Sequence, residues 1–120
     1  MTEQEYMDRC LTIPYKRNSL ITTFGEPMNC YVFIYWFYKL VLDIELENNN
    51  VNSFADIKSI NYKKVEYPQN YDIIDVNTFS KDTHVALYYN GYMYHYTRSG
   101  LQVKNVKRIP NLIRGYYRVS

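Results

Sequence analysis

The chain has 120 residues, of which 47% are hydrophobic and 22% are charged. These proportions are ordinary for a folded protein with one modest core, so we expect residues 1–120 to form a single domain. The net charge of +2 is too small to predict a nucleic-acid partner, which requires a concentrated basic face. We interpret the one basic cluster, Lys104, Lys107 and Arg108, as a solvated edge strand.

The start of the chain predicts synthesis in a cytoplasm. Residues 1–5 are acidic and polar, and they lack the basic start and apolar stretch of a signal peptide. The apolar run at residues 31–42 is interrupted by Lys39 and is too short to span a bilayer, so we expect no membrane span. The two cysteines, Cys10 and Cys30, are fewer than a disulfide-stapled domain would carry, and we expect both thiols to be free.

Two helices are expected in the first half of the chain. Thr2 and Glu5 fit a capping box that begins a helix over residues 3–11, before Ile13-Pro14. Asn29 is a good N-cap for a second helix over residues 30–42, which is apolar almost all round and is therefore expected to be buried. Residues 47–53 are predicted to be a polar loop, and residues 54–60 a helical turn.

From Tyr71 onward the hydrophobic period changes to two, which indicates strands. We expect strands at residues 73–76, 85–89, 92–96, 101–103 and 116–119. Asn90-Gly91 predicts a two-residue hairpin turn between the second and third of these. Helices first and strands later indicate an α+β domain, with the N-terminal helices packed on an antiparallel sheet.

The hairpin places the only two histidines of the chain together. A two-residue turn at 90–91, continued along both strands, puts His84 opposite Thr97 and His95 opposite Ala86. Directly paired residues share a face, so both imidazoles are predicted to project from the same side of the sheet.

The third reactive side chain is Cys30, the first residue after the N-cap. The positive end of a helix stabilises a thiolate, so we expect a lowered pKa for the Cys30 thiol. A thiol, an imidazole and a polar group that orients it are what a cysteine protease needs. Three other interpretations stay open: a buried structural cysteine, ordinary half-buried histidines, or a zinc site, which would need a fourth ligand for a structural role.

Several segments resemble the NlpC family of cell-wall peptidases, which are papain-like cysteine peptidases. The likeness covers roughly residues 10–118. The matching pieces are Asn29-Cys30-Tyr31-Val32-Phe33, His84-Val85-Ala86-Leu87-Tyr88, Tyr94-His95-Tyr96, Ile13-Pro14-Tyr15-Lys16 and Tyr71-Asp72-Ile73-Ile74. Together with Gly115-Tyr116-Tyr117-Arg118 they are closest to compact versions of the domain carried by tailed phages.

The resemblance implies a papain-like NlpC-type fold and a role for each candidate residue. Cys30 would be the nucleophile, His84 the base and His95 the group that orients it. Tyr15, Tyr31 and Tyr88 are candidates for oxyanion or substrate contacts. The resemblance implies no metal and no cofactor.

The substrate implied is the stem or cross-link peptide of bacterial peptidoglycan. The likeness to phage domains implies other phage-tail proteins as partners and a place in the virion, acting on the host cell wall. The sequence departs from the family at Asn29, where aspartate is usual, and at Tyr31 and Val32, where a small residue and glycine are usual. These departures favour the alternative of a catalytically inactive structural or assembly component of a phage tail. A binding module for wall fragments is a third interpretation.

Overall fold

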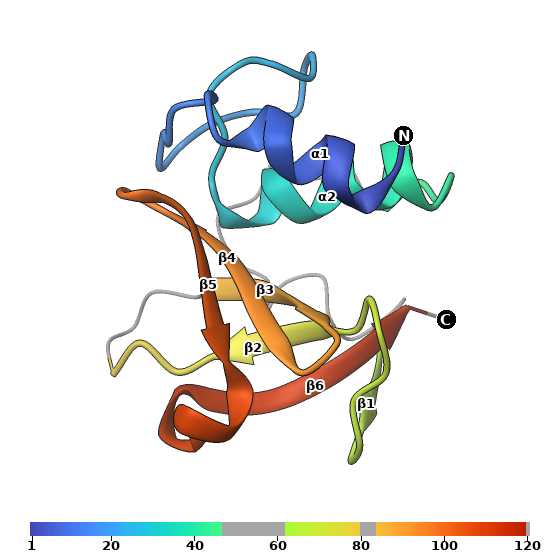
Figure 1. The fold of residues 1–120 in the computed structure, drawn as a ribbon, viewed down its shortest axis with the longest axis vertical. Coiled ribbons are helices and arrows are strands. Elements are labelled where there is room, and N and C mark those ends of the chain that lie inside the picture. Colours follow the sequence, from blue (N-terminus) through green and yellow to red (C-terminus); the bar gives the residue numbers. More distant parts are fainter. Residues whose placement is uncertain (47–61, 80–83, 120) are drawn as a thin grey trace.

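The computed structural model describes residues 1–46, 62–79 and 84–119, and it is shown in Figure 1. Two helices, α1 (Glu3–Cys10) and α2 (Cys30–Val41), precede all the strands. The strands are β1 (Tyr62–Val65), β2 (Ile73–Val76), β3 (His84–Tyr89), β4 (Tyr92–Thr97), β5 (Gly100–Asn105) and β6 (Ile113–Val119). Two short 3-10 helices, η2 (Val106–Arg108) and η3 (Pro110–Leu112), connect β5 to β6.

Helix α1 begins at the predicted capping box. The Thr2 hydroxyl accepts a hydrogen bond from the Glu5 backbone N–H at 3.1 Å, and the Glu5 carboxylate accepts one from the Thr2 N–H at 3.1 Å. The helix ends at Cys10, one residue earlier than expected. Its buried Tyr6 hydroxyl donates to the Phe33 carbonyl at 2.5 Å, which ties α1 to α2.

Helix α2 is the central buried helix, as its apolar sequence predicted. Every residue from Tyr31 to Tyr38 is buried, on all sides of the helix. A helix of this kind is stable only when neighbouring elements cover it all round. Helix α1 covers one side, and strands β3 and β4 of the sheet cover another (Figure 1).

Within the described residues, six strands form one antiparallel sheet in the order β1-β6-β2-β3-β4-β5. The helices lie together on one side of it (Figure 1). This arrangement confirms the α+β class and the five predicted strands. The sequence analysis missed β1 and both 3-10 helices. The polar loop predicted at 47–53 and the helical turn predicted at 54–60 lie outside the described residues.

The expected hairpin register is confirmed near the turn but not farther along. Tyr89 pairs with Tyr92 and Leu87 pairs with Tyr94, as a two-residue turn requires. The predicted pairs of His84 with Thr97 and of Ala86 with His95 do not form in the described ladder, which stops at Leu87. Beyond that point Val85 of β3 lies beside Cys30, at the start of α2.

The two faces of the sheet bury different clusters. Val85, Leu87 and Tyr96 face the helices and join the main core with α1 and α2. Ala86 and Met93 face the other way and form a smaller core with residues of η2, η3 and β6. The basic cluster lies as expected at the edge, with Lys104 on edge strand β5 and Lys107 and Arg108 exposed in η2.

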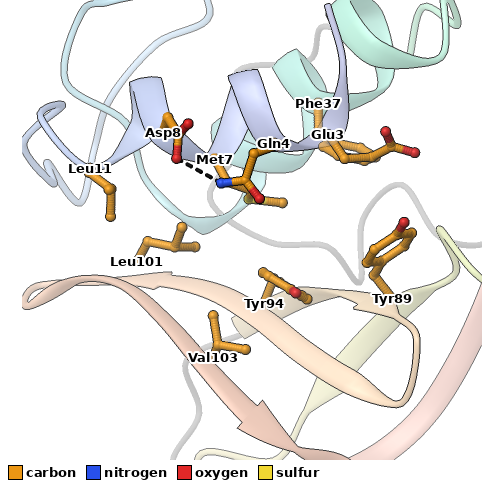
Figure 2. Close-up of a pocket in the computed structure, with 10 residues that line it drawn as sticks. All are labelled: Glu3, Gln4, Met7, Asp8, Leu11, Phe37, Tyr89, Tyr94, Leu101 and Val103. Carbon is orange, nitrogen blue, oxygen red and sulfur yellow. Dashed lines mark hydrogen bonds between the residues drawn. The ribbon is translucent and has the colours of Figure 1, made fainter.

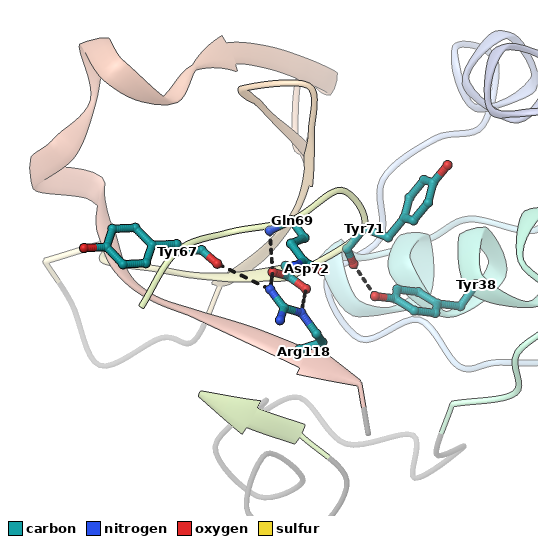
Figure 3. A network of polar contacts seen from close by, with 6 residues as sticks. All are labelled: Tyr38, Tyr67, Gln69, Tyr71, Asp72 and Arg118. Carbon is teal, nitrogen blue, oxygen red and sulfur yellow. Dashed lines mark hydrogen bonds and ion pairs between the residues drawn. The ribbon is translucent and has the colours of Figure 1, made fainter. Parts of the chain in front are cut away.

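An ion pair between a buried carboxylate and a partly exposed guanidinium joins β6 to the start of β2. The Arg118 guanidinium in β6 donates two hydrogen bonds to the Asp72 carboxylate, at 3.0 Å and 2.8 Å (Figure 3). Asp72 is 2% exposed and also accepts from the Gln69 backbone N–H at 2.7 Å. Next to it the Tyr38 hydroxyl of α2 donates to the Tyr71 carbonyl. This network fixes the entry into β2 against both β6 and α2.

Replacing Asp72 with alanine should lower the free energy of unfolding by about 1–2 kcal/mol, because the Gln69 backbone N–H and the partly exposed Arg118 guanidinium both lose their acceptor. Urea denaturation measures this change. The exposed Glu66→Ala variant is the matched control and should change stability by less than about 0.5 kcal/mol. Equal stability of the two variants would contradict the structural role of the pair.

Candidate active site

Cys30 is the first residue of α2, and the backbone before it is held in place by Asn29. The Asn29 side-chain oxygen accepts from the Val32 N–H at 2.9 Å, which confirms the predicted N-cap. The Asn29 side-chain nitrogen donates to the Arg17 carbonyl at 3.0 Å. An aspartate at this position could not make the second bond, because a carboxylate has no N–H to donate. The asparagine that departs from the family pattern therefore ties the loop to the helix start.

The Cys30 sulfur lies against the first residues of β3. It forms a hydrogen bond with the backbone of Val85, and this bond lowers the thiol pKa. Only a donor stabilises a thiolate, so the group involved is the Val85 N–H. Since β2 occupies one edge of β3, this N–H lies on the β4 side, where the ladder has ended. The thiol is thereby fixed beside the peptide bond that joins Val85 to His84.

The two histidines meet, as the sequence predicted. Nε2 of His84 lies 3.0 Å from Nδ1 of His95, and the rings are nearly perpendicular, with an interplanar angle of 74°. At this distance one nitrogen donates a hydrogen bond and the other accepts it. The hydrogen bond engages Nε2 of His84, and Nδ1 of the same ring takes no part in it.

Burial sets the protonation of both imidazoles. Burial lowers the pKa of His84 below its ordinary 6.5. For His95, burial together with the charges of His84 and Lys104 lowers the pKa to about 4. Both rings are therefore neutral near neutral pH. A neutral imidazole can accept a proton, which is what a general base must do.

The expected lowering of the Cys30 pKa is wrong. Burial raises the pKa of this thiol, and the raising effect outweighs the backbone hydrogen bonds of Val85, Tyr31 and Cys30 itself. The helix start does supply N–H groups to the sulfur, as predicted. However, removing the sulfur from water disfavours the thiolate more than these groups favour it. At rest the site therefore holds a neutral thiol and a neutral imidazole.

Tyr15 lies beside the start of α2. Its segment pairs with the residues just before Cys30, since the Met28 N–H donates to the Pro14 carbonyl at 3.0 Å and the Lys16 N–H donates to the Met28 carbonyl at 2.9 Å. The Tyr15 ring is half-buried, 6.4 Å from the ring of Tyr96. The structure thus brings the Ile13-Pro14-Tyr15 motif next to the cysteine, and its catalytic role stays a prediction.

Tyr31 and Tyr88, the other two candidates for substrate contacts, lie in different parts of the structure. Tyr31 is only 6% exposed and belongs to the main core. Tyr88 packs edge-on against Tyr116, with ring centroids 5.8 Å apart, in the smaller core on the other face. Tyr31 is thus mostly covered and Tyr88 is half-buried, and their roles as oxyanion or substrate contacts stay predictions.

The alternative of a metal site finds no support in the geometry of the rings. The His84 and His95 nitrogens face each other at hydrogen-bonding distance, so they do not converge on a common point. In the described part of the chain no group of three potential ligands is arranged to hold a metal ion. Neither cysteine forms a disulfide, as expected. None of the described helices is long and apolar enough to cross a bilayer.

One contributor to the site was missed by the sequence analysis. The Val85 N–H is a backbone group, so no residue type marks it. It is available to the sulfur because the ladder between β3 and β4 ends at Leu87, and no local sequence pattern marks that end. The second hydrogen bond of Asn29 was missed for the same reason, since its acceptor lies 12 residues away.

No family model and no curated protein matches the sequence. Solved structures do match the fold. The NlpC/p60 domain of the peptidoglycan hydrolase SagA aligns with 98% of this chain and 94% of its own, at 14% identity and a TM-score of 0.62. NlpC1 from Trichomonas vaginalis aligns with 95% of this chain at 20% identity and a TM-score of 0.61. This chain spans 42% of that second protein.

At these identities the similarity establishes the fold. The chain has the papain-like NlpC/p60 fold that the sequence resemblance implied, with α2 packed on an antiparallel sheet.

The buried His95 predicts a loss of stability in acid. Its pKa is about 4 in the folded protein and 6.5 in the unfolded chain. The unfolded chain therefore binds more protons in this interval, and stability falls as the pH drops from about 6.5 to about 4. The contribution of His95 is about 2–3 kcal/mol. Urea denaturation of the wild type and of His95→Gln at both ends of the interval isolates it, because glutamine does not titrate. An identical fall in both proteins would contradict the assignment.

Proposed function

We propose that this chain is a cysteine peptidase that hydrolyses peptide bonds in the stem or cross-link peptides of bacterial peptidoglycan. The observation that carries the proposal is the contact between His84 and His95 at 3.0 Å. The Cys30 sulfur is hydrogen-bonded to the backbone of Val85, the residue that follows His84. In the proposal Cys30 supplies the thiol, His84 the base and His95 the group that orients the base. The hydrogen bond of the sulfur to Val85 supports this assignment. The NlpC/p60 fold, which a peptidoglycan hydrolase shares, supports the substrate class.

In this proposal His84 works as a neutral base. We assign the proton of the His84–His95 hydrogen bond to Nε2 of His84, which leaves the lone pair of Nδ1 for the thiol proton. Because the thiol pKa is raised, proton transfer accompanies attack of the sulfur on the substrate carbonyl. His84 then returns the proton to the leaving amine, and water hydrolyses the resulting thioester.

The N–H groups at the start of α2 are the proposed oxyanion donors. The backbone N–H of Cys30 points out of the first turn of a helix that carries no acidic residue there. Helix N-termini stabilise negative charge that develops nearby. Tyr15, held beside this turn by its pairing with Met28, is the proposed side-chain contributor.

We further propose that the protein acts as part of a phage tail, with other tail proteins as partners and the host cell wall as its target. The Ile13-Pro14-Tyr15 motif and the Gly115-Tyr116-Tyr117-Arg118 ending support this assignment. The alternative, an inactive structural component of a tail, is favoured by one observation. Tyr31 and Val32 replace the small residues usual after the nucleophile, although both side chains are buried in the core.

Replacing Cys30 with alanine should abolish the release of peptide fragments from purified peptidoglycan sacculi, a loss of about 1,000-fold or more. Fragment release is measured by chromatography, and circular dichroism checks the fold. Cys10→Ala, which removes the other thiol, is the matched control and should retain activity. Equal release by Cys30→Ala and the wild type would refute the nucleophile assignment, and no release by the wild type would favour the inactive alternative.

The reactivity of Cys30 toward iodoacetamide should rise steadily with pH between about 6 and 9, because both the raised thiol pKa and the neutral histidines oppose a resting thiolate. Mass spectrometry of the alkylated peptide gives the rate at each pH. Cys10 has a pKa of about 12 and is buried, so it should remain unmodified in the native protein. A rate independent of pH down to about 5 would indicate a preformed thiolate–imidazolium pair instead.

A further inference from the structure

A pocket of about 220 Å3 opens between α1 and the strands β3, β4 and β5 (Figure 2). Its apolar wall includes Met7 of α1, Leu11 directly after α1, and Leu101 and Val103 of β5. Leu11 is 69% exposed and Val103 is 50% exposed. Large apolar side chains that remain exposed around one concavity indicate a surface with a function.

This pocket is separate from the candidate active site. Tyr94, which also lines it, points toward the helices (Figure 2). The next residue of β4, His95, points to the opposite face, because successive side chains of a strand alternate. An occupant of the pocket therefore leaves the face of the two histidines uncovered.

The pocket is locally acidic in a protein whose net charge is +2. Glu3 and Asp8 of α1 are part of its lining, and no lysine or arginine is among the described residues that line it. The Glu3 carboxylate accepts from the Tyr71 hydroxyl at 2.7 Å, and this bond lowers the pKa of Glu3. Asp8 accepts from the Gln4 amide at 2.8 Å. A carboxylate has lone pairs for more than one donor, so both can also accept from a cation.

The wall of the pocket formed by β5 is also an edge of the sheet. In the described part of the chain β5 pairs with β4 on one side, and no strand pairs with its other side. Leu101 and Val103 alternate toward the pocket along this edge. An open edge presents backbone N–H and C=O groups to which an extended chain can add as a further strand.

We propose that the β5 edge and this pocket bind an extended segment of a partner protein. The segment pairs with β5, inserts an apolar side chain between Leu101 and α1, and directs a lysine or arginine to the Glu3 and Asp8 carboxylates. Apolar complementarity and opposite charge select this partner, and the backbone of β5 sets its direction. The proposal does not depend on the peptidase function.

The test uses two synthetic heptapeptides and the full chain. The first peptide alternates threonine with leucine and carries a lysine near each end, and the second has glutamate in place of each lysine. Fluorescence anisotropy of labelled peptides gives the two dissociation constants. We expect the basic peptide to bind about tenfold or more tightly than the acidic one, with an affinity that falls as salt rises.

Two variants locate the binding surface. Val103→Lys places a charge on the exposed pocket wall and should weaken the basic peptide about tenfold or more. Asp8→Asn should weaken it severalfold, whereas Glu26→Gln, the same loss of charge at an exposed position outside the pocket, should leave it unchanged. Circular dichroism confirms that the variants fold, and Cys30 alkylation should be the same in all of them.

Three results would overturn the proposal. Equal affinity for the two peptides would remove the role of charge. Undiminished binding to Val103→Lys would place the peptide elsewhere. Binding of a small apolar amine such as benzylamine, without binding of either peptide, would make the pocket a small-molecule site.

Discussion

The arrangement of this protein depends on how the first turn of α2 packs against β3 where the ladder between β3 and β4 ends. The ladder between the two strands stops at Leu87. The Val85 N–H, which would otherwise pair with β4, donates a hydrogen bond to the Cys30 sulfur. Had the hairpin stayed paired to its ends, that N–H would have been used by β4 and the thiol would have no donor there.

This packing partly shields the three groups from water, and the shielding sets the chemistry that the site can perform. Burial raises the pKa of the thiol and lowers that of both imidazoles, so each group rests in its neutral form. The N–H groups around the sulfur stabilise negative charge when it develops on the sulfur during the reaction. Such a site stabilises the thiolate that forms during attack on the substrate, whereas the resting enzyme keeps a neutral thiol.

Much of the fold could be predicted because it depends on local signals. The capping box at Thr2, the N-cap at Asn29 and the Asn90-Gly91 turn each fix an element through hydrogen bonds within a few residues. The ion pair of Asp72 with Arg118 could not be predicted from such local signals, since the partners lie 46 residues apart in the sequence. The packing of Tyr31 and Tyr88 could not be predicted, because an aromatic side chain suits a groove and a core equally well.

By itself the sequence determined the order of helices and strands, the position of Cys30 at a helix start and the shared face of the two histidines. These features follow from periodicity and turn geometry, which act between neighbours along the chain. Only the tertiary structure decided the end of the β3–β4 ladder, the donor to the sulfur and the sign of the Cys30 pKa change. Those depend on how much water the packed elements exclude, and that is a property of contacts between distant segments.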